Sequence, residues 1–167
     1  MDSSLKPEQS YIDVDIAAQR LRLLKANKIT LEYEIATARN GAGELNGSEC
    51  TPRGWHYIRA KIGTGSMANA VFVGRRSTGE IFSEDLREQF PQRDWILTRI
   101  LWLCGLEVGK NRRGNVDTMR RYIYIHGCPD SDVLGVPGSH GCIKMHNQDV
   151  MQLFEQVSAG TRVYIHE

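Results

Sequence analysis

The chain has 167 residues, of which 41% are apolar and 25% charged, and its formal net charge is +1. This length and composition are typical of one globular domain with a substantial core. The even balance of acids and bases argues against a nucleic-acid or anionic-membrane binder, and no apolar run approaches the ~20 residues of a membrane span. The pairs Arg112-Arg113 and Arg120-Arg121 are therefore expected to be solvated surface.

The first residues are polar and lack the apolar segment of a secretory signal. We expect residues 1–9 to form a flexible tail and residues 10–167 to form a single domain. The absence of a signal in this sequence predicts a cytoplasmic location, or a periplasmic one if a leader has been removed.

Most of the chain has the alternating apolar pattern of strands. The pattern predicts strands at 11–16, 21–24, 29–35, 55–62, 70–74, 95–103, 121–126 and 161–165, with a hairpin turn at Asn27. Residues 40–54 and 105–119 are expected to be loops, and the first of these lacks the spacing of a nucleotide-binding loop. Ser83 is expected to cap a short helix over 83–90, and Asn147 to cap an amphipathic helix over 147–158. The interpretation is a mainly β domain with one firm helix.

A cysteine and a histidine near the C-terminal end carry the candidate chemistry. The alternation over 121–126 places Tyr124 and His126 on one strand face, and a turn-rich loop leads from there to Cys142. Because thiolates attack carbonyls, Cys142 is the predicted nucleophile and His126 its base. Backbone N–H groups around His140 and Gly141 are expected to face a developing oxyanion.

Two other interpretations of these residues remain open. The residues His126, Cys128, His140 and Cys142 are potential metal ligands, although they lack standard zinc spacing. Cys128 and Cys142 are candidates for disulfide exchange, whereas Cys50 and Cys104 are expected to be passive. His56 is expected to be a surface or strand residue rather than a ligand.

His126-Gly127, a spacer and then Ser139-His140-Gly141-Cys142 resemble the signature of the YkuD-type L,D-transpeptidases of bacterial cell-wall metabolism. The resemblance covers most of the chain and implies a mainly β, single-domain, sandwich- or barrel-like catalytic fold with one main helix after the nucleophile. Three features depart from the family pattern: a shorter spacer before Ser139, Lys144 in place of Arg or Asn, and Cys128 in place of Ser or Thr.

The resemblance also implies a set of roles for the site residues. Cys142 and His126 would be catalytic, and Ser139, His140 and Gly141 would position the oxyanion. Lys144, Gly127 and Tyr124 would bind substrate, with Lys144 meeting a substrate carboxylate. No metal and no cofactor are implied.

The reaction that the resemblance implies is a ping-pong acyl transfer on peptidoglycan tetrapeptide stems. The cysteine would attack the carbonyl of the third residue, a diamino acid, and D-Ala would leave a thioester behind. With water as acceptor the enzyme would be an L,D-carboxypeptidase that trims soluble muropeptides, which a cytoplasmic location favours. With an amine it would form cross-links or exchange D-amino acids. Carbapenems are expected to acylate the same cysteine, and a non-catalytic peptidoglycan-binding module is the remaining alternative.

Overall fold

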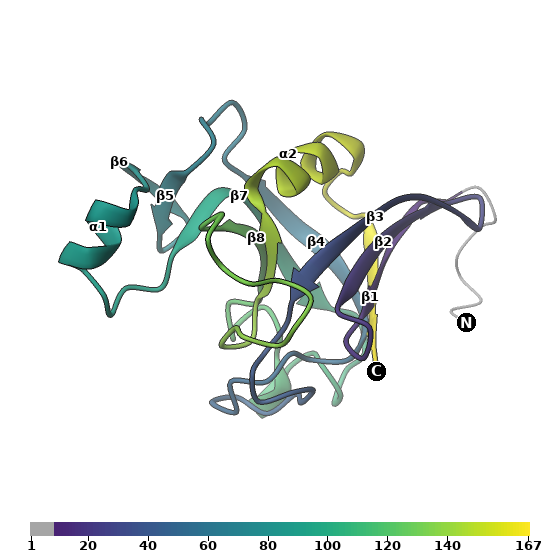
Figure 1. The fold of residues 1–167 in the computed structure, drawn as a ribbon. Helices are drawn as coiled ribbons and strands as arrows, with labels where there is room; N and C mark the ends of the chain where they lie inside the picture. Colours follow the sequence, from purple (N-terminus) through teal and green to yellow (C-terminus); the bar gives the residue numbers. More distant parts are fainter. Residues whose placement is uncertain (1–8) are drawn as a thin grey trace.

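The computed structural model describes residues 9–167, so the predicted tail lies, apart from Gln9, outside the described residues (Figure 1). The strands are β1 (Tyr11–Asp15), β2 (Arg20–Lys25), β3 (Lys28–Ala36), β4 (Gly54–Ile62), β5 (Ala70–Val73), β6 (Arg76–Ile81), β7 (Ile96–Gly105), β8 (Tyr124–Cys128), β9 (Ile143–His146) and β10 (Arg162–His166). The helices are α1 (Glu84–Gln89), the short 3₁₀ helix η1 (Gly114–Val116) and α2 (Asn147–Gln156).

The strands form one sheet that closes on itself. Their order in the sheet is β4-β10-β1-β2-β3-β9-β8-β7-β5-β6. A further pairing of β4 with β7, the first and eighth strands in this order, closes the sheet. The β5–β6 hairpin extends this closed sheet and, with α1, forms a lobe that projects to one side in Figure 1. The predicted mainly β, barrel-like fold with one main helix is therefore confirmed.

Alternation along the strands fills the interior of the closed sheet. Ile12 and Val14 are fully buried, whereas Asp13 between them is only half-buried. The apolar face of α2 places Val150, Leu153 and Phe154 in the same core. This helix covers β7, β8 and β9. Among the described residues no helix is long and apolar enough to cross a membrane.

Several local predictions agree with the structure. The β2–β3 hairpin turns at Ala26 and Asn27, which have φ angles of 49° and 62°, as a two-residue hairpin turn requires. The hydroxyl of Ser83 accepts a hydrogen bond from the N–H of Leu86 at 3.1 Å, which caps α1. At both places the local sequence is sufficient to predict the structure.

Other predictions were wrong where tertiary contacts decide the structure. Strand β8 begins at Tyr124 rather than at residue 121, because the chain still turns at Tyr122, where φ is +56°, and it continues to Cys128. His56 lies on strand β4, which agrees with the strand alternative of its prediction; it is not a surface residue, because it is fully buried with its ring hydrogen-bonded to Gly54 O and Thr118 Oγ1. Strands β6 and β9 were not predicted. The expected surface loop over 105–119 contains buried Asn111 and Thr118.

Asn147 is not the N-cap of α2, since that position belongs to His146. Its buried amide instead joins three parts of the chain. Asn147 Oδ1 accepts from Thr98 Oγ1 at 2.6 Å, and Nδ2 donates to Cys128 O at 2.8 Å and to Asn69 Oδ1 and Asp130 Oδ1 at 3.0 Å. This amide therefore fixes the start of α2 against β7 and the end of β8.

Replacing this amide tests its structural role. Asn147→Ala leaves several buried partners without hydrogen bonds, so we expect it to lower the free energy of unfolding by about 2–3 kcal/mol. Gln148→Ala, at the exposed next position of the helix, is the matched control and should change it by less than about 0.5 kcal/mol. Urea denaturation followed by circular dichroism measures both. Equal stability of the two variants would contradict this role.

Candidate active site

Parallel pairing of β8 and β9 brings the predicted nucleophile and base together. In the register Ile125 lies opposite Ile143, and His126 opposite Lys144. Cys142 directly precedes β9, so it lies beside Tyr124 at the start of β8. Because side chains alternate along strands, Tyr124, His126, Cys142 and Lys144 share one face of this strand pair.

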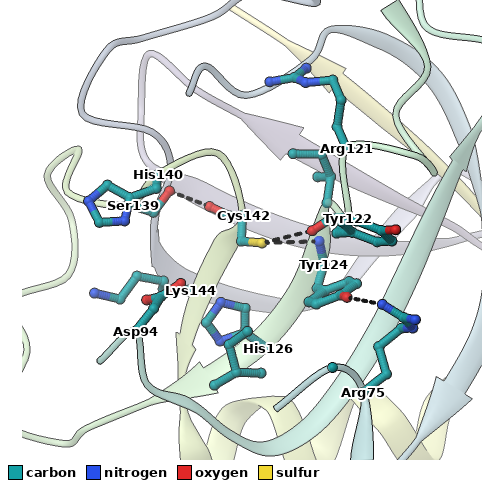
Figure 2. A pocket seen from close by; sticks show the side chains of 13 residues that line it. Arg75, Asp94, Arg121, Tyr122, Tyr124, His126, Ser139, His140, Cys142 and Lys144 are labelled. Carbon is teal, nitrogen blue, oxygen red and sulfur yellow. Dashed lines mark hydrogen bonds between the residues drawn. The ribbon is translucent and has the colours of Figure 1, made fainter. Parts of the chain in front are cut away.

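This face forms the floor of a cavity of about 520 Å³ (Figure 2). Its wall also includes the tip of the β5–β6 hairpin, the start of β7 and the turns before β8 and β9. The lining residues are Gly74, Arg75, Asp94, Ile96, Arg121, Tyr122, Ile123, Tyr124, His126, Ser139, His140, Cys142 and Lys144.

The Cys142 thiol is protonated in the resting protein. Burial raises the pKa of Cys142 to about 12, although the Tyr124 N–H and the charge of Arg121 act in the opposite direction. The Tyr124 N–H donates to Sγ at 3.3 Å, and the thiol donates to Tyr122 O at 3.4 Å. A thiol with this pKa needs a base to become a nucleophile near neutral pH.

The His126 imidazole is suited to be that base. It is 2% exposed, and burial lowers its pKa, so the ring is neutral near pH 7. Nδ1 lies 2.7 Å from Gly127 O. Since a carbonyl only accepts, Nδ1 carries the proton and Nε2 keeps a free lone pair. In Figure 2 this ring lies below Cys142, and both residues line the same cavity.

The turn that carries Cys142 is held by Ser139. Its hydroxyl donates to Cys142 O at 2.5 Å and accepts from the Gly141 N–H at 3.2 Å. The Gly141 N–H is therefore engaged within the turn. Gly141 has a φ of +130°, and a β-carbon there would lie 3.1 Å from Ile123 Cδ1, so this position requires glycine. His140 is exposed at the rim.

The three predicted substrate-binding residues have different surroundings. Lys144 lines the cavity, but its ammonium binds Asp132 Oδ2 at 2.6 Å, so its charge is already paired. Tyr124 lines the cavity and accepts a hydrogen bond from Arg75 through its hydroxyl. Gly127 is buried, and a β-carbon there would meet Asn147 Oδ1 at 2.5 Å, so it faces the interior rather than the cavity.

Arg121 was predicted to be solvated surface, and that prediction was wrong. Its half-buried guanidinium donates to Cys50 O at 2.6 Å and to Gly43 O at 3.3 Å. It therefore ties the Gly-rich loop to the cavity and contributes a positive charge near the sulfur. The cavity residues Arg75 and Asp94 were also missed, because only the fold brings them to the site.

The disulfide interpretation does not fit the geometry. Cys128 lies opposite His146 at the far end of the β8–β9 ladder. His146 is four residues after Cys142, so the two cysteines are separated by about 13 Å along the strands. Both cysteines are free thiols. Burial raises the pKa of Cys128 to about 12, and its thiol donates to Met145 O at 3.2 Å. The described residues contain no cluster of three potential metal ligands.

Residues 9–165 match the family YkuD, described as the L,D-transpeptidase catalytic domain. Over 159 residues the chain is 46% identical to YqjB of Bacillus subtilis (strain 168), which is named for this family; the match covers 95% of this chain and 72% of YqjB. The Enterococcus faecium L,D-transpeptidase superposes with a TM-score of 0.58 at 20% identity. L,D-transpeptidase 3 from Mycobacterium tuberculosis, in complex with a faropenem-derived adduct, also gives 0.58, at 14% identity.

Each of these two superpositions covers 95% of this chain. The chain spans only 50% and 60%, respectively, of the two structures. At such low identity the likeness is one of fold. It agrees with the closed sheet and the single main helix described above.

The pKa of Cys142 predicts how the thiol reacts with a simple alkylating agent. With a pKa of about 12, only about one molecule in ten thousand is thiolate at pH 8, so alkylation should rise about tenfold per pH unit from 7 to 10. Iodoacetamide labelling of the Cys142 peptide, followed by mass spectrometry in a Cys50→Ser background, measures this. A plateau near pH 7 would instead indicate a thiolate–imidazolium pair and contradict a neutral resting site.

Proposed function

The chain belongs to the family of L,D-transpeptidase catalytic domains, and we propose that it uses Cys142 and His126 to transfer acyl groups from peptidoglycan tetrapeptide stems. One observation carries the proposal: a neutral thiol and a neutral imidazole with a free Nε2 line the same cavity.

The proposed first step forms a thioester. As Cys142 Sγ attacks the carbonyl carbon of the third stem residue, its proton passes to His126 Nε2. The tetrahedral intermediate collapses, His126 returns the proton to the amine of D-Ala, and D-Ala leaves. Because the Nδ1–H of His126 is held by Gly127 O, Nε2 stays available both to accept the thiol proton and to pass it to the leaving amine.

We propose water as the acceptor of the second step. Water needs no binding site of its own, so hydrolysis requires nothing beyond the cavity described, and His126 Nε2 can deprotonate water as it deprotonates the thiol. Cross-linking requires a second peptide amine to reach the thioester. Transpeptidation is the second candidate, because the names of the relatives support it.

Incubation with a disaccharide-tetrapeptide decides between the acceptors. We expect mass spectrometry to show release of D-Ala and accumulation of the tripeptide product. Cys142→Ala should abolish turnover, and His126→Gln should reduce it by about 10²- to 10⁴-fold, because proton transfer is lost. Dimers without tripeptide would contradict hydrolysis, and full activity of Cys142→Ala would contradict the whole proposal.

Acylation by a carbapenem is a second, independent test of the nucleophile. Solved relatives include one with a faropenem-derived adduct and one with imipenem, and the fold likeness supports testing the same chemistry here. We expect the intact mass to increase by one drug molecule in the unmodified protein and in Cys50→Ser. Cys142→Ala should show no increase. An adduct of equal yield on that variant would place the reactive group elsewhere.

A further inference from the structure

Arg75 occupies an unusual position at the tip of the β5–β6 hairpin. Gly74 and Arg75 form its two-residue turn, with φ angles of 56° and 64°. Glycine or asparagine is usual in such a conformation, which costs other residues roughly 1 kcal/mol. The arginine nevertheless stands there, and the same tip forms one wall of the cavity. The turn therefore places the Arg75 side chain in the cavity wall.

Three aromatic side chains hold the Arg75 guanidinium in place. Its central carbon lies 4.6 Å from the ring centre of Trp102 and 5.0 Å from that of Tyr122. Its Nη1 donates to the Tyr124 hydroxyl at 3.0 Å (Figure 2). Stacking on aromatic faces leaves the edge of a guanidinium free, and only one of its five N–H groups is used in this bond.

The guanidinium has no carboxylate partner within residues 9–167. Five other arginines each lie within 4.0 Å of an acidic oxygen: Arg20, Arg22, Arg53, Arg87 and Arg93. The other arginine of the cavity, Arg121, donates to backbone carbonyls instead, and Lys144 is paired with Asp132. Arg75 is thus an ordered cation in the cavity wall with donors to spare, which is the arrangement that suits a carboxylate ligand.

The length of Tyr124 separates Arg75 from the Cys142 sulfur. Its N–H donates to Cys142 Sγ, and its hydroxyl, at the other end of the residue, accepts from Arg75. The carboxylate of a leaving D-Ala lies only about one residue, ~4 Å, from the attacked carbonyl. A group that reaches Arg75 must extend farther than this, along a whole tyrosine side chain. The end of a long side chain on the attacked residue meets this requirement.

We propose that Arg75 determines donor specificity by binding a carboxylate at the far end of the side chain of the third stem residue. This inference rests on the proposed function, since it takes Cys142 as the group that attacks that residue. The third residue is accordingly a diamino dicarboxylic acid rather than lysine. Asp94 lies on the opposite side of His126 in Figure 2, so the negative wall of the cavity is away from Arg75.

The test compares tetrapeptide donors that differ only in this group. The donors carry a diamino dicarboxylic acid at position three, the same residue with its side-chain carboxylate converted to an amide, or lysine. The unmodified protein should show a kcat/KM about 10- to 100-fold higher for the carboxylate donor, the range expected for a charge-assisted bidentate contact. Arg75→Gln should lose this preference and turn over the three donors at similar low rates.

Two further variants separate recognition from folding. Arg75→Gly removes the cation and suits the turn, so it should lose the preference while its melting temperature stays at or near that of the unmodified protein. Arg76→Gln, at the adjacent exposed position, is the matched control and should keep the full preference.

The possible outcomes distinguish the two proposals. Turnover of all three donors at equal rates by the unmodified protein would overturn the role of Arg75 and leave the acyl transfer intact. A preference that persists in both Arg75 variants would also overturn it and assign recognition to another residue. Absence of turnover with every donor would instead contradict the proposed function.

Discussion

The active-site geometry depends on the parallel pairing of β8 with β9. This pairing sets His126 opposite Lys144 and brings Cys142 beside Tyr124, although a long loop separates the two strands in the sequence. A shift of one residue would turn His126 away from the cavity, since neighbouring side chains on a strand face opposite sides. The buried amide of Asn147 and the hydroxyl of Ser139 fix the two ends of β9, so the register is held by polar contacts as well as by the core.

Burial of the site disfavours charge on both Cys142 and His126. It raises the pKa of the thiol and lowers that of the imidazole, so the resting pair is neutral. In the proposed reaction the sulfur becomes a nucleophile as its proton moves to His126. The charged residues Arg75, Arg121 and Asp94 stand around this neutral centre and give the cavity its polarity.

The sequence predicted the parts of the architecture that depend on local patterns. Alternation identified β1 and β3, and the hairpin with β3 identified β2. Ser83 correctly marked the start of α1. Prediction from the sequence failed where long-range contacts decide the structure. Asn147 has the chemistry of a helix cap, yet its side chain lies in the core, bonded to partners on β7 and β8. The short strands β6 and β9 are formed by pairing with neighbours distant in the chain or across a tight turn, which no window of a few residues reveals.

The candidate nucleophile and base were recognisable from the sequence, but the cavity wall was not. Arg75 and Asp94 come from segments without a motif, and only the folded chain gives Arg121 the carbonyl partners that distinguish it from a surface arginine. The proposed proton transfer requires a neutral His126 with its proton on Nδ1. Nitrogen-15 NMR of the His126 ring at pH 7 tests it most directly. We predict one protonated nitrogen, Nδ1, and one unprotonated nitrogen, Nε2, at this pH, because burial lowers the pKa of the ring. Two protonated nitrogens at pH 7 would show an imidazolium, which cannot accept the thiol proton.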